Sequence, residues 1–268
     1  MIEVKHLTKR YGKHTAVDDI SFTVQDGCIY GLLGPNGAGK STTMNMITGY
    51  LAPTGGTVAI DGHDVQEEPK EAKACIGYLP EIPPLYTDMT VQEYLLFVSE
   101  LKGKKKKADR VQDVAQAVQR AGLQEMEKRL IRNLSKGYRQ RVGIAAALLG
   151  SPKVIILDEP TAGQDFRHYT DIMEFLRGLN EQGVTVVMIT HDMHLMLEYT
   201  PRALVFCDGQ LIADRSAAAV LCDPELIEQA ALKETSLFTL ANRCGIAPAE
   251  DFVERFIHED REVRTHGC

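Results

Sequence analysis

Three carboxylates lie within eight positions behind an apolar run in the middle of the chain, at the start of the stretch LDEPTAGQDFRHYTD at 157–171. Asp158 and Glu159 come directly after a predicted strand, and Asp165 lies further along the stretch. A carboxylate at the end of a buried parallel strand can bind Mg²⁺, and its neighbour can orient or deprotonate a water molecule. An Asp-Glu pair alone is more often a solvated strand end, so this chemistry requires a phosphate site elsewhere in the chain.

A glycine-rich segment upstream predicts that phosphate site. The stretch LLGPNGAGKSTT at 32–43 matches the pattern G-x-x-x-x-G-K-[ST], called a P-loop, after a buried strand and at the start of a helix. Its backbone N–H groups can surround phosphates, Lys40 can bridge the β- and γ-phosphates, and the Ser41 hydroxyl can bind Mg²⁺. The residues predicted to contact a nucleotide here are Gly34, Pro35, Asn36, Gly37, Ala38, Gly39, Lys40, Ser41 and Thr42.

The hydrophobic pattern predicts the α/β fold that would position these groups. Alternating residues predict strands up to about position 33, which indicates an antiparallel β lobe leading into a buried strand. The period becomes helical over about 85–150, where Thr90 and Glu93 form a predicted capping box. Strands and helices alternate again from 153 to 215, which is typical of a parallel sheet.

Two regions are expected from these patterns. Residues 1–215 form one nucleotide-binding domain that contains the helical insert at 85–150. Residues 216–268 form a small appendage, in which Pro224, Gly245 and Pro248 delimit three predicted helices.

Composition excludes some classes of protein. The formal net charge of −7 argues against a general nucleic-acid binder, which usually presents a broad basic surface. Six scattered cysteines without a CxxC pair predict reduced thiols in the cytosol. The N-terminus lacks a signal-peptide pattern, and no stretch of about 18 apolar residues occurs. We therefore expect a protein that is neither exported nor membrane-spanning.

A lysine run, KGKKKK at 102–107, lies between two predicted helices. Such a run usually forms a solvated loop, and this is the first interpretation. Contact with anionic lipid headgroups beside a membrane partner is the second.

The stretch LSKGYRQR at 134–141 indicates the class of protein. It resembles the signature of the ATP-binding cassette (ABC) family, commonly LSGGQ, and the order P-loop, signature, ILDEPT and THD resembles that family's ATPase subunit. Ser135 can cap a helix whose N–H groups face a phosphate, and Gly137 allows close approach. Lys136 and Tyr138 stand where the family commonly has glycine and glutamine.

Other roles follow only from this resemblance. Tyr11 matches the aromatic residue that stacks on adenine, with Val17 beside it, and His191 matches the switch histidine that contacts the γ-phosphate. Asp165 matches the loop that crosses the dimer interface. Glu81 occupies the place of the family's Q-loop glutamine; it keeps an oxygen for Mg²⁺ and water and adds negative charge.

The resemblance implies ATP and Mg²⁺ as ligands and a head-to-tail dimer that closes on ATP. Ser41, Asp158 and Glu81 would bind Mg²⁺, Glu159 would polarise the attacking water, and His191 would stabilise the transferred phosphate. The implied partners are membrane-embedded permease subunits and a second ABC ATPase domain, in a homodimer or heterodimer, without nucleic acid. The implied location is cytoplasmic, peripheral on the inner face of the cell membrane.

The subfamily resemblance changes along the chain. Residues 1 to about 150 resemble ATPases of ABC-2 type exporters. From about 160 to the C-terminus the chain resembles energy-coupling-factor importer ATPases, which take up vitamins or transition-metal ions and use a C-terminal helical segment to stay paired. The change falls near 142–162, and either a natural mosaic or a join could produce it.

Three alternatives to an exporter-type ATPase stay open. The first is an energy-coupling-factor importer ATPase, if the C-terminal half sets the partner. The second is a soluble ABC ATPase without a transport function. The third is a cassette that only binds nucleotide.

Overall fold

A six-stranded sheet forms the centre of the protein in this computed structural model, which describes residues 1–161, 166–233 and 236–266. Its strand order is β10-β9-β3-β8-β7-β6, and all neighbours are parallel except β9 and β10. The strands are β3 (Ile29–Leu33), β6 (Ile76–Leu79), β7 (Val154–Asp158), β8 (Thr185–Ile189), β9 (Arg202–Cys207) and β10 (Gln210–Arg215). The predicted parallel α/β sheet is confirmed.

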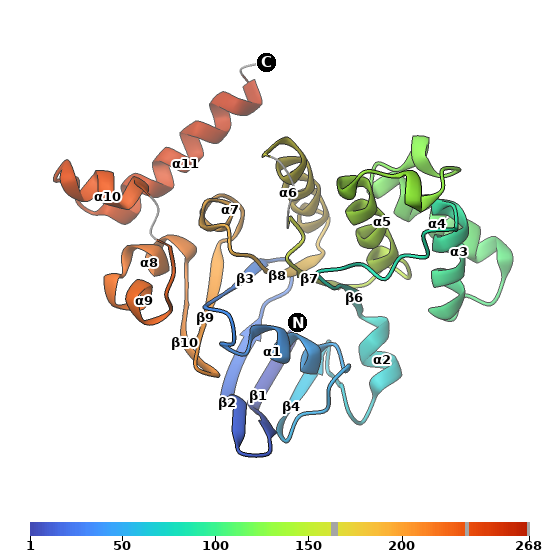
Figure 1. The fold of residues 1–268 in the computed structure, drawn as a ribbon, viewed down its shortest axis with the longest axis horizontal. Coiled ribbons are helices and arrows are strands. Elements are labelled where there is room, and N and C mark those ends of the chain that lie inside the picture. The colour runs from blue at the N-terminus through green and yellow to red at the C-terminus, as the bar shows by residue number, and fades with distance from the viewer. Residues whose placement is uncertain (162–165, 234–235, 267–268) are drawn as a thin grey trace.

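A second sheet of four antiparallel strands forms the N-terminal lobe, in the order β2-β1-β4-β5. Its strands are β1 (Ile2–Tyr11), β2 (His14–Val24), β4 (Gly55–Ile60) and β5 (His63–Asp64). Figure 1 shows this lobe and helix α1 (Lys40–Ile47) on one side of the parallel sheet, and α6 (Phe166–Glu181) and α7 (Met193–Tyr199) on the other.

Alternation along the parallel strands separates two cores. Ile156 packs with the lobe and α1, whereas its neighbours Ile155 and Leu157 pack with α6 and α7. Successive side chains of a strand point to opposite faces, so a sheet covered on both sides needs continuous apolar strands. The sequences IYGLL and VIIL meet this requirement, with every residue buried.

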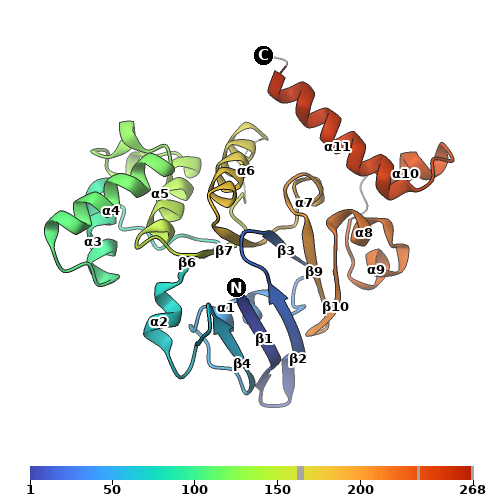
Figure 2. The same ribbon diagram turned by 180° about the vertical axis from the view of Figure 1, so that it is seen from behind.

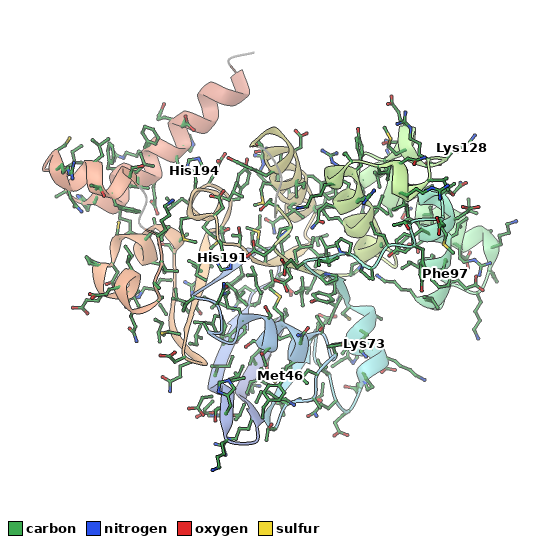
Figure 3. The ribbon with its side chains drawn as sticks, viewed as in Figure 1. Met46, Lys73, Phe97, Lys128, His191 and His194 are labelled. Atoms are coloured by element: carbon green, nitrogen blue, oxygen red, sulfur yellow. The ribbon has the colours of Figure 1, made fainter. Side chains whose placement is uncertain are left out.

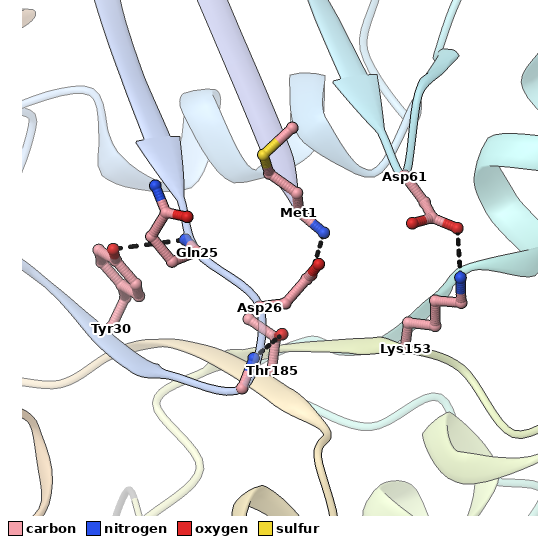
Figure 4. A network of polar contacts seen from close by, with 8 residues as sticks. Met1, Gln25, Asp26, Tyr30, Asp61, Lys153 and Thr185 are labelled. Carbon is pink, nitrogen blue, oxygen red and sulfur yellow. Dashed lines mark hydrogen bonds and ion pairs between the residues drawn. The ribbon is translucent and has the colours of Figure 1, made fainter.

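Polar contacts fix the lobe to the parallel sheet, as Figure 4 shows. The Lys153 ammonium lies 2.6 Å from Asp61, and the amino group of Met1 pairs with Asp26. The Gly27 N–H donates to the Thr185 hydroxyl at 2.9 Å. These contacts hold the lobe close to the amino-terminal ends of β3, β7 and β8.

The helical insert lies beyond β6 and has a core of its own (Figures 1 and 2). It follows a short helix α2 (Pro69–Ala74) that the sequence patterns did not predict. The predicted capping box is confirmed, since the Thr90 hydroxyl accepts from the Glu93 N–H and the Glu93 carboxylate accepts from the Thr90 N–H. The insert contains α3 (Val91–Leu101), α4 (Lys107–Arg120), short 3₁₀ turns η1 (Gln124–Met126) and η2 (Ile131–Asn133), and α5 (Lys136–Leu148).

The C-terminal region contains four described helices where three were predicted. They are α8 (Ala217–Cys222), α9 (Pro224–Gln229), α10 (Ser236–Arg243) and α11 (Ala249–His266). The short α8 was missed, although Ser216 caps it by accepting from the Ala219 N–H at 3.0 Å. Buried side chains such as Leu221 and Val253 join the core beneath α6 and α7, so the appendage packs directly on the nucleotide-binding domain.

Candidate functional site

A cavity of about 660 Å³ opens between the lobe and the carboxyl ends of the parallel strands. It is lined by Tyr11, His14, Ala16, Asn36, Gly37, Ala38, Gly39, Lys40, Ser41, Thr42, Glu81, Asp158, Glu159, Ile189 and His191. The fold therefore brings most of the predicted nucleotide and catalytic residues to one place. Sequence reasoning missed His14, Ala16 and Ile189. His14 could have been predicted, because it pairs with Tyr11 across the first hairpin.

The P-loop requires glycine at two places where its backbone passes other chain segments. Gly34 has φ 135°, and a Cβ there would lie 2.1 Å from the Phe206 carbonyl oxygen. Gly39 has φ 99°, and its Cβ would lie 2.6 Å from the Ala16 carbonyl oxygen. These φ values and clashes exclude other residues. The tight loop leads into α1, whose first N–H groups can bind phosphate oxygens.

Lys40 is the buried cation of the cavity. Its ammonium donates to the carbonyl oxygens of Gly34 at 2.6 Å and Pro35 at 2.9 Å. Burial lowers the Lys40 pKa, while the charges of Glu159 and Asp158 oppose that shift. Lys40 thus places positive charge beside the two carboxylates and within the phosphate loop.

Glu159 is the most strongly perturbed carboxylate of the cavity. Its φ of 49° turns the chain sharply after β7, and its N–H donates to the Ile189 carbonyl oxygen at 3.1 Å. Burial, with the charge of Asp158 as the next cause, raises the pKa of Glu159 to about 7. Its buried Oε1 has no hydrogen-bond partner among the described residues, so its capacity to accept a hydrogen bond is unused.

His191 lies directly beside Glu159, at the end of β8. Its Nε2 is 3.3 Å from Glu159 Oε1, but the pair lacks hydrogen-bond geometry. Burial, followed by the charge of Lys40, lowers the His191 pKa. The imidazole is therefore neutral near pH 7, and Figure 3 shows it near the middle of the molecule.

Asp158 and Glu81 complete the polar edge of the cavity. Burial raises the Asp158 pKa first, the negative charge of Glu81 raises it further, and Lys40 opposes both. Glu81 follows β6 and is exposed at the cavity rim. Together with the Ser41 hydroxyl, these oxygens are the ligand type that Mg²⁺ prefers.

Tyr11 and Val17 occupy different environments. The Tyr11 ring is 51% exposed at the cavity rim, and the Lys9 ammonium lies 5.2 Å from the ring centroid. Val17 is fully buried in the core behind Gly39 and does not line the cavity. Stacking of Tyr11 on adenine stays a prediction, and Val17 could act only as support behind the loop.

The signature residues lie apart from this cavity. The Ser135 hydroxyl caps α5 by accepting from the Tyr138 N–H at 3.4 Å, Gly137 is buried, and Lys136 is exposed. None of these residues lines the nucleotide cavity. The predicted interface residue Asp165 falls outside the described residues. A phosphate contact from the signature would therefore have to reach the cavity of another cassette.

The parallel sheet, the P-loop and the strand-end carboxylates define a P-loop nucleotide-binding cassette. The family model described as ABC transporter matches residues 17–162. The chain belongs to this family, which confirms the resemblance and the expected fold class.

Curated relatives match nearly the whole chain. A putative ABC transporter ATP-binding protein of Enterococcus faecalis is 42% identical over 98% of this chain and 47% of its own length. One of Clostridium perfringens is 39% identical over 99% of this chain and 47% of its own length. The chain spans about half the length of these relatives. The same relatives cover both halves of the chain, so the difference in subfamily resemblance stays a prediction.

Solved structures show the same fold. A nucleotide-free ATP-binding cassette from an ABC transporter has a TM-score of 0.77 and 28% identity, covering 85% of this chain and 97% of that chain. A dimeric cassette bound to ADP and phosphate has a TM-score of 0.72 and 29% identity over 81% and 99%. CbiO1 of Clostridium perfringens, part of the CbiONQ transporter complex, has a TM-score of 0.77 and 27% identity over 90% and 98%.

Proposed function

We propose that the chain is the ATP-binding and ATP-hydrolysing subunit of an ABC membrane transporter. The observation that carries this proposal is the buried, unpartnered Oε1 of Glu159 in the same cavity as the P-loop. A carboxylate with a pKa of about 7 is well suited to accept a proton from water at neutral pH. These properties favour a hydrolytic cassette over one that only binds nucleotide.

Mg²⁺ fits the oxygen donors of Ser41, Asp158 and Glu81, and it would supply charge neutralisation of the phosphates when bound. No described group of three or more His, Cys, Asp or Glu side chains could hold a metal by itself. The other ligands of the ion would therefore come from the nucleotide phosphates and water. The cation would also reduce the repulsion between Glu81 and Asp158.

The catalytic step can be assigned to three side chains. Lys40 binds the phosphate oxygens and offsets their charge from within the loop. Glu159 accepts a proton as a water molecule attacks the γ-phosphorus, and the neutral His191 contacts the phosphoryl oxygens by hydrogen bonding. Because His191 lies beside Glu159, both can act on the same phosphate.

A second cassette would complete the site. The separation of Ser135 and Gly137 from the cavity supports a head-to-tail dimer, in which each signature contacts the other cassette's ATP. The half of the curated relatives that this chain does not span is long enough for another cassette. The second cassette could therefore be another copy, a related chain, or part of the same longer chain.

An apolar groove supports a membrane partner. It has a volume of about 580 Å³ between the segment after β6, α3 and α5, and its lining includes Tyr50, Tyr86, Phe97 and Leu101. Tyr50 is 84% exposed and Tyr86 is 55% exposed. An apolar groove of this kind fits an amphipathic helix. From this groove we infer attachment at the cytoplasmic face through a permease. No described helix could itself cross a membrane.

An importer of the energy-coupling-factor type is the second candidate. Residues 1–215 make up about 80% of the chain (215 of 268), whereas the match with CbiO1 covers 90%. The match therefore includes part of the C-terminal helices. Affinity capture from native membranes would separate the candidates, since this one requires vitamin or metal-ion transporter subunits in the complex.

The substitution Glu159→Gln tests the proposed hydrolysis. It removes the base and keeps the shape of the side chain, so we expect unchanged ATP affinity and a loss of phosphate release of about 10²- to 10⁴-fold. Binding of a fluorescent ATP analogue and phosphate release would measure the two effects. The matched control Glu228→Gln changes an exposed carboxylate on α9 and should keep full activity. Wild-type turnover by Glu159→Gln would contradict the assignment.

A further inference from the structure

The connection between α3 and α4 carries five lysines within the six residues 102–107 of an otherwise acidic chain. Lys105, Lys106 and Lys107 are exposed, and Lys104 is half-buried. No ion pair joins Lys104, Lys105, Lys106 or Lys107 to a carboxylate in the described part of the protein. Of the nearby acids, Asp109 lies in the first turn of α4, Glu100 pairs with Arg110 at 2.9 Å, and buried Asp113 accepts from Ser99 and the Gly150 N–H.

Helix stability does not account for these lysines. Lys106 is the N-cap of α4 without a capping side-chain hydrogen bond, and Lys107 is its first residue. Positive charge at a helix N-terminus opposes the helix dipole, and Ser, Thr, Asp or Asn would cap better. Four adjacent lysines also repel one another. The run is therefore unfavourable in the isolated fold, and an anionic partner would offset that cost.

Lys102 differs from the lysines that follow it. Its ammonium donates to the carbonyl oxygens of Ala147 at 3.0 Å and Leu149 at 2.8 Å, at the carboxyl end of α5. This contact fixes the start of the connection against α5. Leu101 and Lys102 also line the apolar groove, and Leu101 is 70% exposed. The four free lysines therefore begin directly beside the groove proposed to receive the permease.

We propose that Lys104, Lys105, Lys106 and Lys107 bind the anionic lipid headgroups of the bilayer that holds the permease. This inference rests on the proposed function for the orientation of the groove toward the membrane. Clusters of four or more lysines bind anionic bilayers by summed electrostatic attraction. The exposed Leu101 next to the run adds an apolar contact at the interface. The other possible partner is an acidic segment of the permease, and the experiment separates the two.

The test floats the purified chain with vesicles of phosphatidylcholine alone or of phosphatidylcholine mixed with phosphatidylglycerol. We expect binding only to the mixed vesicles and loss of binding at high salt, because salt screens the attraction. Replacing Lys104, Lys105, Lys106 and Lys107 by glutamine should weaken binding by about fivefold per lysine. These side chains do not line the nucleotide cavity, so ATP hydrolysis should not change.

A matched control has the same net charge as the variant with four glutamines, but its four substitutions are spread over the surface. The variant with Lys70→Gln, Arg120→Gln, Lys128→Gln and Lys233→Gln also removes four positive charges, which changes the formal charge from −7 to −11 (−7 − 4). Lys128 lies on the helical insert in Figure 3. We expect this control to keep most of its vesicle binding, since the loss should follow the local cluster rather than the total charge.

Two results would overturn the lipid proposal. One is absence of wild-type binding to the mixed vesicles, and the other is an equal loss in both variants. A third result would identify an acidic protein segment as the partner. In that case the wild type does not bind vesicles, and only the variant with residues 104–107 replaced by glutamine fails to bind a co-expressed permease. A chain that binds vesicles but does not hydrolyse ATP contradicts the proposed function instead.

Discussion

Glu159 acquires its properties from its surroundings. The turn after β7 places its side chain in a partly closed cavity beside Asp158, where ionisation lacks full solvation. Lys40 and the backbone contact with His191 lower its pKa but do not cancel the effect of burial. Burial thus gives Glu159 a pKa of about 7, whereas a solvated glutamate has a pKa of about 4.3.

The pH dependence of turnover follows from this residue. Only the ionised Glu159 can accept a proton, so kcat/KM for ATP should rise with pH and inflect near its pKa of about 7. Burial lowers the pKa of His191, which favours the neutral ring near pH 7. Steady-state phosphate release from pH 6 to pH 8 would measure the profile. The residual rate of Glu159→Gln should not depend on pH. A wild-type rate that decreases as the pH rises would contradict the role of Glu159 as the base.

The same shift links Glu159 to stability. Because its folded-state pKa is raised, the folded protein holds the proton more tightly, and that stabilising contribution is lost as the pH rises through about 7. We expect Glu159→Gln to unfold at a higher temperature than the wild type at pH 8, with a smaller difference at pH 6. Equal melting temperatures at both values would show that burial of the charge has no net cost.

Tyr11 allows a test of nucleotide recognition at the cavity rim. Its exposed ring can stack on a base, so Tyr11→Ala should weaken ATP binding about tenfold, within the range for base-aromatic stacking. Titration with ATP would measure the change. Tyr86→Ala is a suitable control, because this equally exposed ring lines the apolar groove and should leave ATP affinity unchanged.

Helix α5 connects three features that are distant along the chain. Its N-terminus carries the signature, its side lines the apolar groove, and its carboxyl end accepts from Lys102. A Cβ at Gly143 would lie 2.5 Å from the Leu79 side chain, so α5 approaches the end of β6 very closely. Movement of the groove and of the signature should therefore be coupled through this helix.

Lys102 gives a stability test at the scale of this helix. Its ammonium satisfies carbonyl oxygens at the end of α5, so Lys102→Met should destabilise the protein by about 1 kcal/mol. Thermal unfolding would detect a decrease of about 2–4 °C. The neighbouring Lys105→Met removes the same charge without a described contact and should have little effect. Equal shifts in both variants would show that charge, not the contact, is responsible.

The molecule carries two separate parts of the proposed ATP site, the nucleotide cavity and the signature around Ser135. Mg·ATP should convert the hydrolysis-deficient Glu159→Gln variant to a dimer, because the bound nucleotide persists between the cassettes. Light scattering with and without Mg·ATP would measure this. Adding Ser135→Arg to that variant should abolish dimer formation while leaving ATP affinity unchanged, since Ser135 does not line the cavity of its own chain. A dimer that survives Ser135→Arg would contradict the head-to-tail arrangement.

The sequence predicted those parts of the fold that are set by residues close together in the chain. Alternating strands, the P-loop and the capping box of Thr90 and Glu93 depend on neighbouring residues, and the structure contains all of them. Helices α2 and α8 were missed because six residues give too little helical period to recognise. The Lys102 contact was also invisible, since its partners Ala147 and Leu149 are far away in the sequence.

The sequence by itself determined which residues could perform the chemistry and the order of the elements that carry them. Only the tertiary structure decided that Glu159 is half-buried beside His191, that Val17 lies behind the loop, and that the signature lies outside the cavity. Residue types and short-range periodicity depend only on residues that are neighbours in the sequence. Burial, pKa and the distance between remote residues depend on how the sheets and helices pack, so they exist only in the folded chain.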